Sequence, residues 1–310
     1  MATQDISAGL PASNAALYGA DRPMTFARRM EFLLPYLLLA PAALFLAVFF
    51  ALPMVQALLL AIQKPDDTFT LDYVQKMVSD VNFTDALRNT LVIIALAVPL
   101  QFVLAIIMGL VIQARPRGAS FFLYFWTIPL GVSDLAAGLV WLAIFGDRGF
   151  LNSVLQGLGL LQSPFAFLSF ESPVTLVMAV VIAELWRATS IVMVIVVAGL
   201  QLIPPDYLEA AEVFGASRWQ RVWKVMLPMI RPSLQVALIL RTILAFQIFA
   251  VAIALAGRAL PVLASEAYNR YGELNPNLAA AYAGLILLFS LFTTALYLRT
   301  VNVGEAEAGK

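Results

Sequence analysis

A polar loop over residues 201–229 holds the residues whose types and spacing are best suited to specific chemistry. It contains a Glu-Ala-Ala triplet at Glu209–Ala211, then three residues and Gly215, then nine residues that lead to Val-Met-Leu-Pro at Val225–Pro228. The glutamates of the loop share a helix face, but a docking surface explains them better than catalysis does. The chemistry indicated is recognition, in which a short amphipathic helix lies in a cleft of a partner protein.

The first half of the loop is predicted to form a short amphipathic helix. Asp206 follows two prolines and has Glu209 three residues later, an arrangement typical of a helix N-cap, and Gly215 suits a left-handed helix end. Apolar residues recur at helical spacing and form one face, on which paired alanines let another protein approach closely. The surface expected to contact the partner comprises Tyr207, Glu209, Ala210, Ala211, Phe214, Gly215, Leu227 and Pro228.

The second half of the loop is predicted to form another short helix. Ser217 and Gln220 would start it as a capping box, and the Leu-Pro pair at 227–228 would end it before the next apolar segment. The alternative for this half is a helix that lies on lipid headgroups. Its basic and aromatic residues would suit that alternative, and they are Arg218, Trp219, Arg221, Trp223 and Lys224.

Four charged residues stand within apolar segments long enough to cross a membrane. They are Asp134, Glu184, Arg187 and Arg241. A charge at the centre of a bilayer costs about 2.5–3.5 kcal/mol on insertion scales, so each needs a physical reason. One interpretation is a water-filled solute path, to which neutral side chains such as Gln247 and Gln101 would add hydrogen bonds. The other is an internal ion-pair network that fixes helix packing, which the equal number of acids and bases favours.

The composition of the chain places most of it in lipid. Of its 310 residues, 62% are hydrophobic and 12% are charged, with a mean hydropathy of +0.88, whereas soluble domains carry about 25% charged residues. The lack of cysteine and histidine excludes thiol chemistry, disulfides and imidazole catalysis. Zero net charge gives no electrostatic support for nucleic-acid binding. The sequence has no phosphate-binding Gly-x-x-x-x-Gly-Lys-Ser/Thr loop, so we expect it to hold no ATP and no other cofactor.

Six apolar segments reach the length of about 20 residues that a spanning helix needs. They are residues 32–62, 89–113, 119–146, 173–200, 230–256 and 278–298. We therefore expect an all-α membrane domain over 31–300, with tails at 1–30 and 301–310. Its outer connections are expected to be loops with short helices. Lys and Arg are more frequent on the side that holds both termini and the 201–229 loop, which places that side in the cytoplasm.

The loop motif resembles the EAA loop of permease subunits from carbohydrate-type ABC importers, the maltose and glycerol-phosphate group. The triplet, the glycine and the Leu-Pro pair match in order and spacing, with Val225 in place of the usual isoleucine. Trp186-Arg187, the stretch at 198–204 and Arg241-Thr242 also fit, so the resemblance covers roughly residues 30–300.

Two positions depart from that family pattern. Phe214 stands where the family usually has Asp before the glycine, which bears on details of the ATPase contact. After the fifth apolar segment, residues 246–250 read Phe-Gln-Ile-Phe-Ala in place of the usual Phe-Asp stretch, which bears on the class of solute.

The resemblance implies a fold, a function and a set of partners. The fold is that of a six-helix ABC importer permease in the cell membrane, which passes a sugar, oligosaccharide, polyol or similar solute into the cytoplasm. The partners are a second homologous permease, two ATPase subunits that hold ATP and Mg, and an extracytoplasmic solute-binding protein. Two alternatives stay open. One is a secondary transporter driven by an ion gradient, with a titrating acid such as Asp134 or Glu184, and the other is a non-transporting membrane scaffold.

Overall fold

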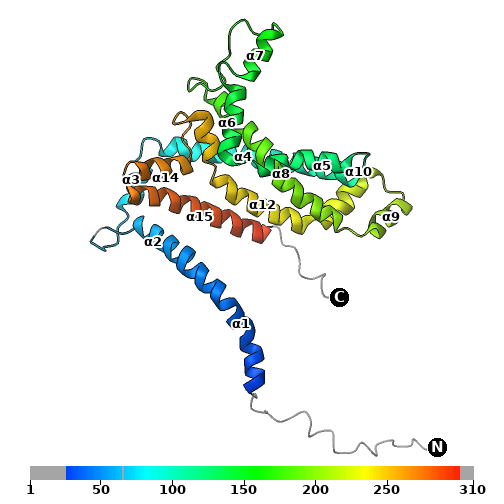
Figure 1. Ribbon diagram of the computed structural model, residues 1–310, viewed down its shortest axis with the longest axis horizontal. Coiled ribbons are helices and arrows are strands. Elements are labelled where there is room, and N and C mark those ends of the chain that lie inside the picture. Colours follow the sequence, from blue (N-terminus) through cyan, green and yellow to red (C-terminus); the bar gives the residue numbers. More distant parts are fainter. Residues whose placement is uncertain (1–25, 65, 301–310) are drawn as a thin grey trace, which may run out of the picture. The chain divides into compact units, whose positions relative to one another are not determined.

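The computed structural model describes the backbone of residues 26–64 and 66–300, and the chain divides into one unit that ends at Gln56 and a second that starts at Ala57 (Figure 1). The predicted tails lie outside the described residues, except that residues 26–30 belong to the first helix. Within the described residues, helices are joined by loops, and an isolated bridge pairs Gln63 with Phe69. The prediction of an all-α protein is therefore confirmed.

The apolar segment predicted at 32–62 is a helix whose hydrogen bonding changes near a proline. It comprises α1 (Phe26–Leu46), a π-helical segment (Ala47–Ala51) and α2 (Leu52–Leu60). Pro35 and Pro41 lie inside α1 without ending it. Pro53 has no N–H to donate, and directly before it the Leu52 N–H donates to the Ala47 carbonyl, five residues back. One widened turn thus accommodates Pro53 while the helix continues.

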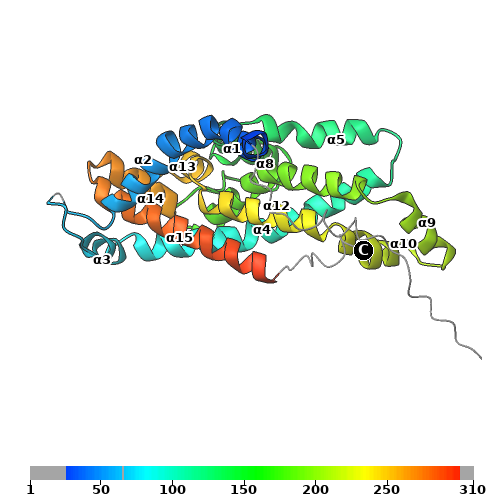
Figure 2. The ribbon, with the colours of Figure 1, turned by 90° about the horizontal axis from the view of Figure 1, so that it is seen from below.

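The second unit contains four long helices whose axes are roughly parallel (Figures 1 and 2). They are α4 (Phe83–Gln113), α8 (Pro173–Gln201), α12 (Arg231–Phe246) and α15 (Pro276–Thr300). Helix α8 is central, because it packs against both α4 and α12. Of its most apolar 18-residue stretch, 61% is buried, compared with 28% of the corresponding stretches of α4 and α15. The exposed apolar faces of α4 and α15 are suited to lipid.

Three apolar clusters fill the interior of this unit, and two of them lie along α8. One surrounds Leu176 and Val180 in the first half of α8, and the other surrounds Val196 and Leu200 in its second half. Small residues such as Ala183 allow neighbouring helices to approach α8 closely. The charged part of α8 lies between the two clusters in the sequence.

The third predicted span, 119–146, is broken, which corrects the expectation of one continuous helix. Helix α5 (Ala119–Thr127) is followed by a 3-10 turn (Ile128–Gly131) and by α6 (Asp134–Phe145), with a bend of 103° between the two halves. Pro129 cannot continue an α-helical hydrogen-bond ladder. The extended Ser133 starts a new helix, because its Oγ accepts a hydrogen bond from the Ala136 N–H at 3.2 Å.

The fifth predicted span, 230–256, is divided as well. Helix α12 ends at Phe246 and α13 spans Ala250–Ala256, so residues 247–249 are non-helical. The helical segment before α12 is also bent against it, by 67°. Within the described residues, four helices are long and apolar enough to cross a membrane, or up to six when each bent pair is counted as one span. The predicted number of six spans is therefore approximately confirmed.

Short helices occupy the three connections predicted to face outward. They are α3 (Asp72–Val78), α7 (Phe150–Gly157) and α14 (Leu263–Gly272). Arg270 on α14 forms salt bridges with Asp80 at 2.7 Å and with Glu266 at 3.4 Å. Because Asp80 lies three residues before Phe83, the first residue of α4, this arginine fastens α14 to the start of that helix.

Candidate functional site

The loop at 201–229 forms a helical hairpin with a glycine corner, as predicted. Helix α9 spans Pro205–Val213 and α10 spans Arg218–Arg221. Between them Gly215 has a φ of +75°, and the Ala216 N–H reaches back to the Ala211 carbonyl at 2.9 Å while the Gly215 N–H reaches Glu212 at 2.9 Å. This pair of bonds is the Schellman arrangement, which uses a left-handed residue to satisfy the last carbonyls of a helix.

The predicted capping box at the start of α10 is confirmed. The Gln220 N–H donates to Ser217 Oγ at 3.3 Å, and the Ser217 N–H donates to Gln220 Oε1 at 2.8 Å. A salt bridge of 2.9 Å from Arg221 to Glu212 then joins α10 to α9. The hairpin is therefore held by its own polar contacts, which leaves its apolar side chains free for other partners.

The two outer ends of the hairpin differ from the prediction. Helix α9 begins at Pro205 without a side-chain cap, and Asp206 lies in its first turn. The ring of Pro205 already has helical φ and lacks the N–H that a cap would satisfy, so the helix starts two residues earlier than a cap at Asp206 would place it. At the other end, the helix does not stop at Leu227. A π-helical segment (Val222–Met226) leads into α11 (Leu227–Met229), because the Leu227 N–H donates to Val222 just before Pro228, which has no N–H.

The residues of the predicted contact surface fall into two groups. Tyr207, Glu209, Ala210, Phe214 and Gly215 are exposed, and Phe214 is 90% exposed. Ala211 is partly buried, and so are Leu227 and Pro228, which lie instead on the wall of a groove beside α4. Sequence reasoning missed Val213, which is 86% exposed next to Phe214 and adds to the apolar tip of the hairpin. The sequence signal that could have identified it is its position directly before Phe214 and Gly215, at the corner of the hairpin.

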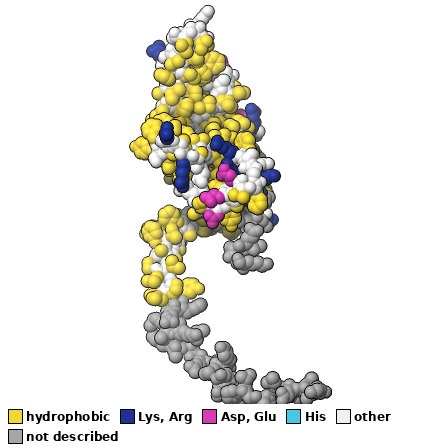
Figure 3. All heavy atoms as spheres, turned by 90° about the vertical axis from the view of Figure 1, so that its right-hand side faces the viewer, with side chains coloured by type: hydrophobic (Ala, Val, Ile, Leu, Met, Phe, Trp, Pro, Cys, Tyr) yellow, Lys and Arg dark blue, Asp and Glu magenta, His cyan; other side chains and the backbone are white. Residues whose placement is uncertain are grey.

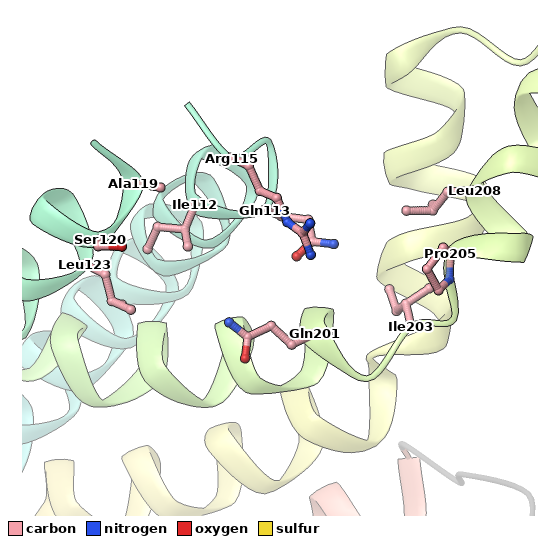
Figure 4. A pocket seen from close by; sticks show the side chains of 10 residues that line it. All are labelled: Ile112, Gln113, Arg115, Ala119, Ser120, Leu123, Gln201, Ile203, Pro205 and Leu208. Atoms are coloured by element: carbon pink, nitrogen blue, oxygen red, sulfur yellow. The ribbon is translucent and has the colours of Figure 1, made fainter. Parts of the chain in front are cut away.

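A cavity of about 680 Å³ separates part of α9 from the helix ends behind it (Figure 4). The side chains of Gln113 and Arg115, at the end of α4, lie across this cavity from Gln201 at the end of α8, and Pro205 and Leu208 of α9 complete its lining. Leu208 also packs beside the second apolar cluster. Helix α9 thus makes a limited apolar contact with the long helices through Leu208, and the cavity leaves open space between α9 and the ends of α4 and α8.

The four charged residues of the spans are brought together in one network. Arg241 Nη2 donates to Glu184 Oε2 at 2.8 Å, and both side chains are 1% exposed. Arg187 reaches Asp134 at 2.8 Å and Glu184 at 3.3 Å. These contacts join α6, α8 and α12. Two acids and two bases compensate one another in a region where an unpaired charge would be costly.

Gln101 completes this network from α4. Its side chain is fully buried, its Oε1 accepts a hydrogen bond from Arg241 Nε at 2.6 Å, and its Nε2 donates to the Glu184 carbonyl at 3.0 Å. The sequence indicated a polar residue at this position but could not show that it binds Arg241. Each of the two guanidinium groups retains one buried nitrogen without a hydrogen-bond partner among the described residues. These atoms are Arg241 Nη1 and Arg187 Nε.

Gln247 lies apart from this network. It follows the last residue of α12, in the break before α13, and its side chain is exposed. Asp134 is the exposed edge of the network, with 55% of its side chain accessible, whereas Glu184 is its buried centre. The candidates for a solute path therefore divide into a buried, paired group and two residues that remain accessible.

Residues 78–301 match the family described as "Binding-protein-dependent transport system inner membrane component". The trehalose transport system permease protein SugA of Mycobacterium tuberculosis is 35% identical over 233 residues, which cover 73% of each chain. The sn-glycerol-3-phosphate transport system permease protein UgpA of Agrobacterium fabrum is 29% identical over 284 residues, which cover 87% of this chain and 95% of the relative.

A solved structure shares the fold. A chain from the bacterial alginate ABC transporter, in complex with an alginate pentasaccharide-bound periplasmic protein, has a TM-score of 0.73 and 20% sequence identity over 90% of this chain and 99% of that chain. Together with the sequence matches, this shows that the chain belongs to the inner membrane components of binding-protein-dependent transport systems, the permease subunits of ATP-driven ABC importers. The resemblance inferred from the loop motif is confirmed.

Proposed function

We propose that this permease passes a sugar, oligosaccharide, polyol or related polyhydroxyl solute into the cytoplasm. Support comes from the named solutes of its relatives, trehalose and sn-glycerol-3-phosphate. Within the chain, Gln247 and Asp134 are two accessible polar residues of the broken spans and are suited to contact hydroxyl groups along a path. Hydroxyl groups are both donors and acceptors, so an amide and a carboxylate can bind them together.

We further propose that α9 is the helix through which an ATPase subunit moves the spans. The observation that carries this proposal is the apolar tip formed by Tyr207, Val213 and Phe214, which is exposed on a hairpin held by its own capping box and salt bridge. An exposed apolar helix of this kind is typical of docking into a groove. The cavity beside Leu208 gives the helix room to move relative to α4 and α8.

The complete importer is proposed to contain this chain, a second permease, two ATPase subunits that bind and hydrolyse ATP with Mg, and an extracytoplasmic solute-binding protein. Both termini and the hairpin would face the cytoplasm, as the distribution of Lys and Arg indicates. The ion-pair network of the spans would hold α6, α8 and α12 in fixed positions relative to one another while the two permeases move.

The alternatives predict other features. A secondary transporter needs an intramembrane acid that is free to bind and release an ion, whereas the carboxylate of Glu184 is occupied by Arg241 and Arg187. A scaffold without transport would tolerate changes in the spans while loop changes abolish its function. Transport by vesicles that contain this chain alone would favour the secondary transporter.

The lack of cysteine in this chain permits a direct test of the docking surface. A single Phe214→Cys variant, purified with its ATPase partner and treated with a short thiol-to-amine cross-linker, should give an adduct with that subunit. Val236→Cys is the matched control, because Val236 is 60% exposed on α12 within a span. Capture of the ATPase at residue 236 but not at residue 214 would refute the docking proposal.

The solute proposal needs a separate measurement. Proteoliposomes that contain the full importer should take up labelled disaccharides or glycerol phosphate in an ATP-dependent manner, and an amino acid should not be transported. If only the amino acid were transported, the solute class would be wrong while the docking surface could still hold.

A further inference from the structure

An apolar groove of about 530 Å³ lies beside α4. Its other wall is the bent helical segment of residues 218–231, which leads from α10 into α12 and is called the elbow here. Val103 and Ile107 form part of one wall, and Trp219, Trp223 and Arg231 form part of the other. The docking contact proposed above does not account for this groove, because it is made by the exposed tip of α9. The groove is therefore a separate feature of the loop.

The α4 wall of the groove is continuous with a lipid-exposed face. Val103 is 55% exposed and Ile107 is 53% exposed, and both belong to the most apolar of the long helices. A groove that opens onto such a face is accessible to the hydrocarbon chains of the bilayer. Its volume suits one such chain, since a protein helix with its side chains is about 10–12 Å across and needs a wider channel.

The opposite wall has the composition of a membrane interface. Trp219 and Trp223 lie with ring centroids 6.4 Å apart and are 68% and 64% exposed. Tryptophan is enriched where hydrocarbon meets headgroups. These rings would mark the level at which a lipid chain ends and its polar head begins.

The charged residues of the elbow are all basic. Arg231 lines the groove, and Arg218 and Lys224 lie on the helical segments that lead to it. The sequence contains no acidic residue between Glu212 and Glu266, and Glu212 is paired with Arg221. Figure 3 shows Lys and Arg side chains, and also Asp and Glu side chains, among hydrophobic ones at the end of the molecule that carries α9 and α10. An anionic head is therefore favoured over a zwitterionic one.

We propose that the groove binds one acyl chain of an anionic phospholipid, with the lipid phosphate at Arg231. The bound lipid braces the elbow at a point where the helix is weakened by its π-helical segment and by the interruption at Ile230. The inference goes beyond the proposed coupling function, because it holds whether or not α9 docks onto an ATPase.

The test is native mass spectrometry of the purified full chain with added phosphatidylglycerol or phosphatidylcholine of identical acyl chains. Near-surface basic residues each contribute about 1 kcal/mol to anionic lipid binding, so we expect roughly fivefold tighter retention of phosphatidylglycerol. Arg231→Gln should bring the ratio close to one. Arg299→Gln is the matched control, because this exposed arginine lies in the last turn of α15 and does not line the groove, and it should keep the preference.

A second variant separates the groove from simple attraction at the surface. Val103→Trp adds volume to the groove without changing charge, and it should weaken retention of both lipids by a similar factor. Equal retention of the two lipids by the unmodified chain, or an unchanged preference in Arg231→Gln, would overturn the proposal. It would also be overturned if a photoreactive residue at position 103 captured a protein subunit of the assembled importer in place of lipid.

Discussion

The chain forms a glutamate–arginine ion pair in two very different surroundings. The bridge from Arg221 to Glu212 in the hairpin measures 2.9 Å, and the bridge from Arg241 to Glu184 in the spans measures 2.8 Å. The side chains of the first pair are 23% and 69% exposed, whereas both side chains of the second are 1% exposed. Water competes with the first bridge and is excluded from the second, so equal geometry carries unequal energy.

The difference extends from the two pairs to the regions around them. The buried network joins four helices, and its polar groups pair with one another. Its members are Gln101, Asp134, Glu184, Arg187 and Arg241. The hairpin is held by its own capping box and salt bridge, and it exposes apolar side chains at its tip. A region that is closed on itself is suited to hold a structure together, and a region with an open apolar surface is suited to bind another molecule.

The largest effect is expected from Glu184→Ala. Removing this carboxylate leaves Arg241 buried without its ionic partner, which costs about 3–5 kcal/mol for a buried pair. The yield of folded chain and its resistance to thermal unfolding should fall sharply. Unchanged stability together with an altered solute preference would place Glu184 in the solute path and break the comparison.

Phe214→Asp should have the next largest effect, on assembly and not on folding. A charge at the centre of an apolar contact commonly costs 2 kcal/mol or more, so binding of the ATPase subunit should weaken by about 30-fold. Thermal stability of the free chain should stay the same, because Phe214 is 90% exposed. Leu274→Asp is a matched control on the connection between α14 and α15, where the leucine is 91% exposed, and it should leave ATPase binding unchanged.

Gly215→Ala should weaken the same binding by a smaller factor. A β-carbon at position 215 meets no atom within 4 Å, so the cost comes from the φ of +75° alone. A left-handed alanine costs about 1–2 kcal/mol, which should lower ATPase binding and uptake roughly 5- to 30-fold. Gly157→Ala, which also meets open space but has no positive φ, is the control. Normal solute-stimulated ATP hydrolysis by the 215 variant would count against α9 as the coupling helix.

The smallest effect is expected from Glu212→Gln. An exposed bridge contributes about 0–1 kcal/mol, so ATPase binding should change by less than fivefold. A double-mutant cycle with Arg221→Gln, measured at low and at high salt, would give the coupling energy directly. A coupling energy as large as that of the buried pair would show that the hairpin bridge is shielded in the assembled importer.

Several local features could be predicted because they depend on neighbours in the sequence. The glycine corner and the Ser217–Gln220 capping box involve residues within a few positions of one another, so spacing alone determines them. The start of α9 was predicted two residues late, because the helical φ of Pro205 outweighed the capping tendency of Asp206. The breaks in the third and fifth spans were missed, because hydrophobicity is continuous across Pro129 and Gln247.

The sequence by itself determined that this chain belongs in a membrane, that its polar loop turns at Gly215 and restarts at a capping box, and that its intramembrane charges balance. These properties are set by composition and by short-range spacing. Only the tertiary structure decided that Gln101 binds Arg241, that Glu184 is the centre of the network, and that Leu227 and Pro228 face a groove in place of the hairpin tip. Those contacts join helices that lie far apart in the sequence, and helical spacing does not specify which faces meet.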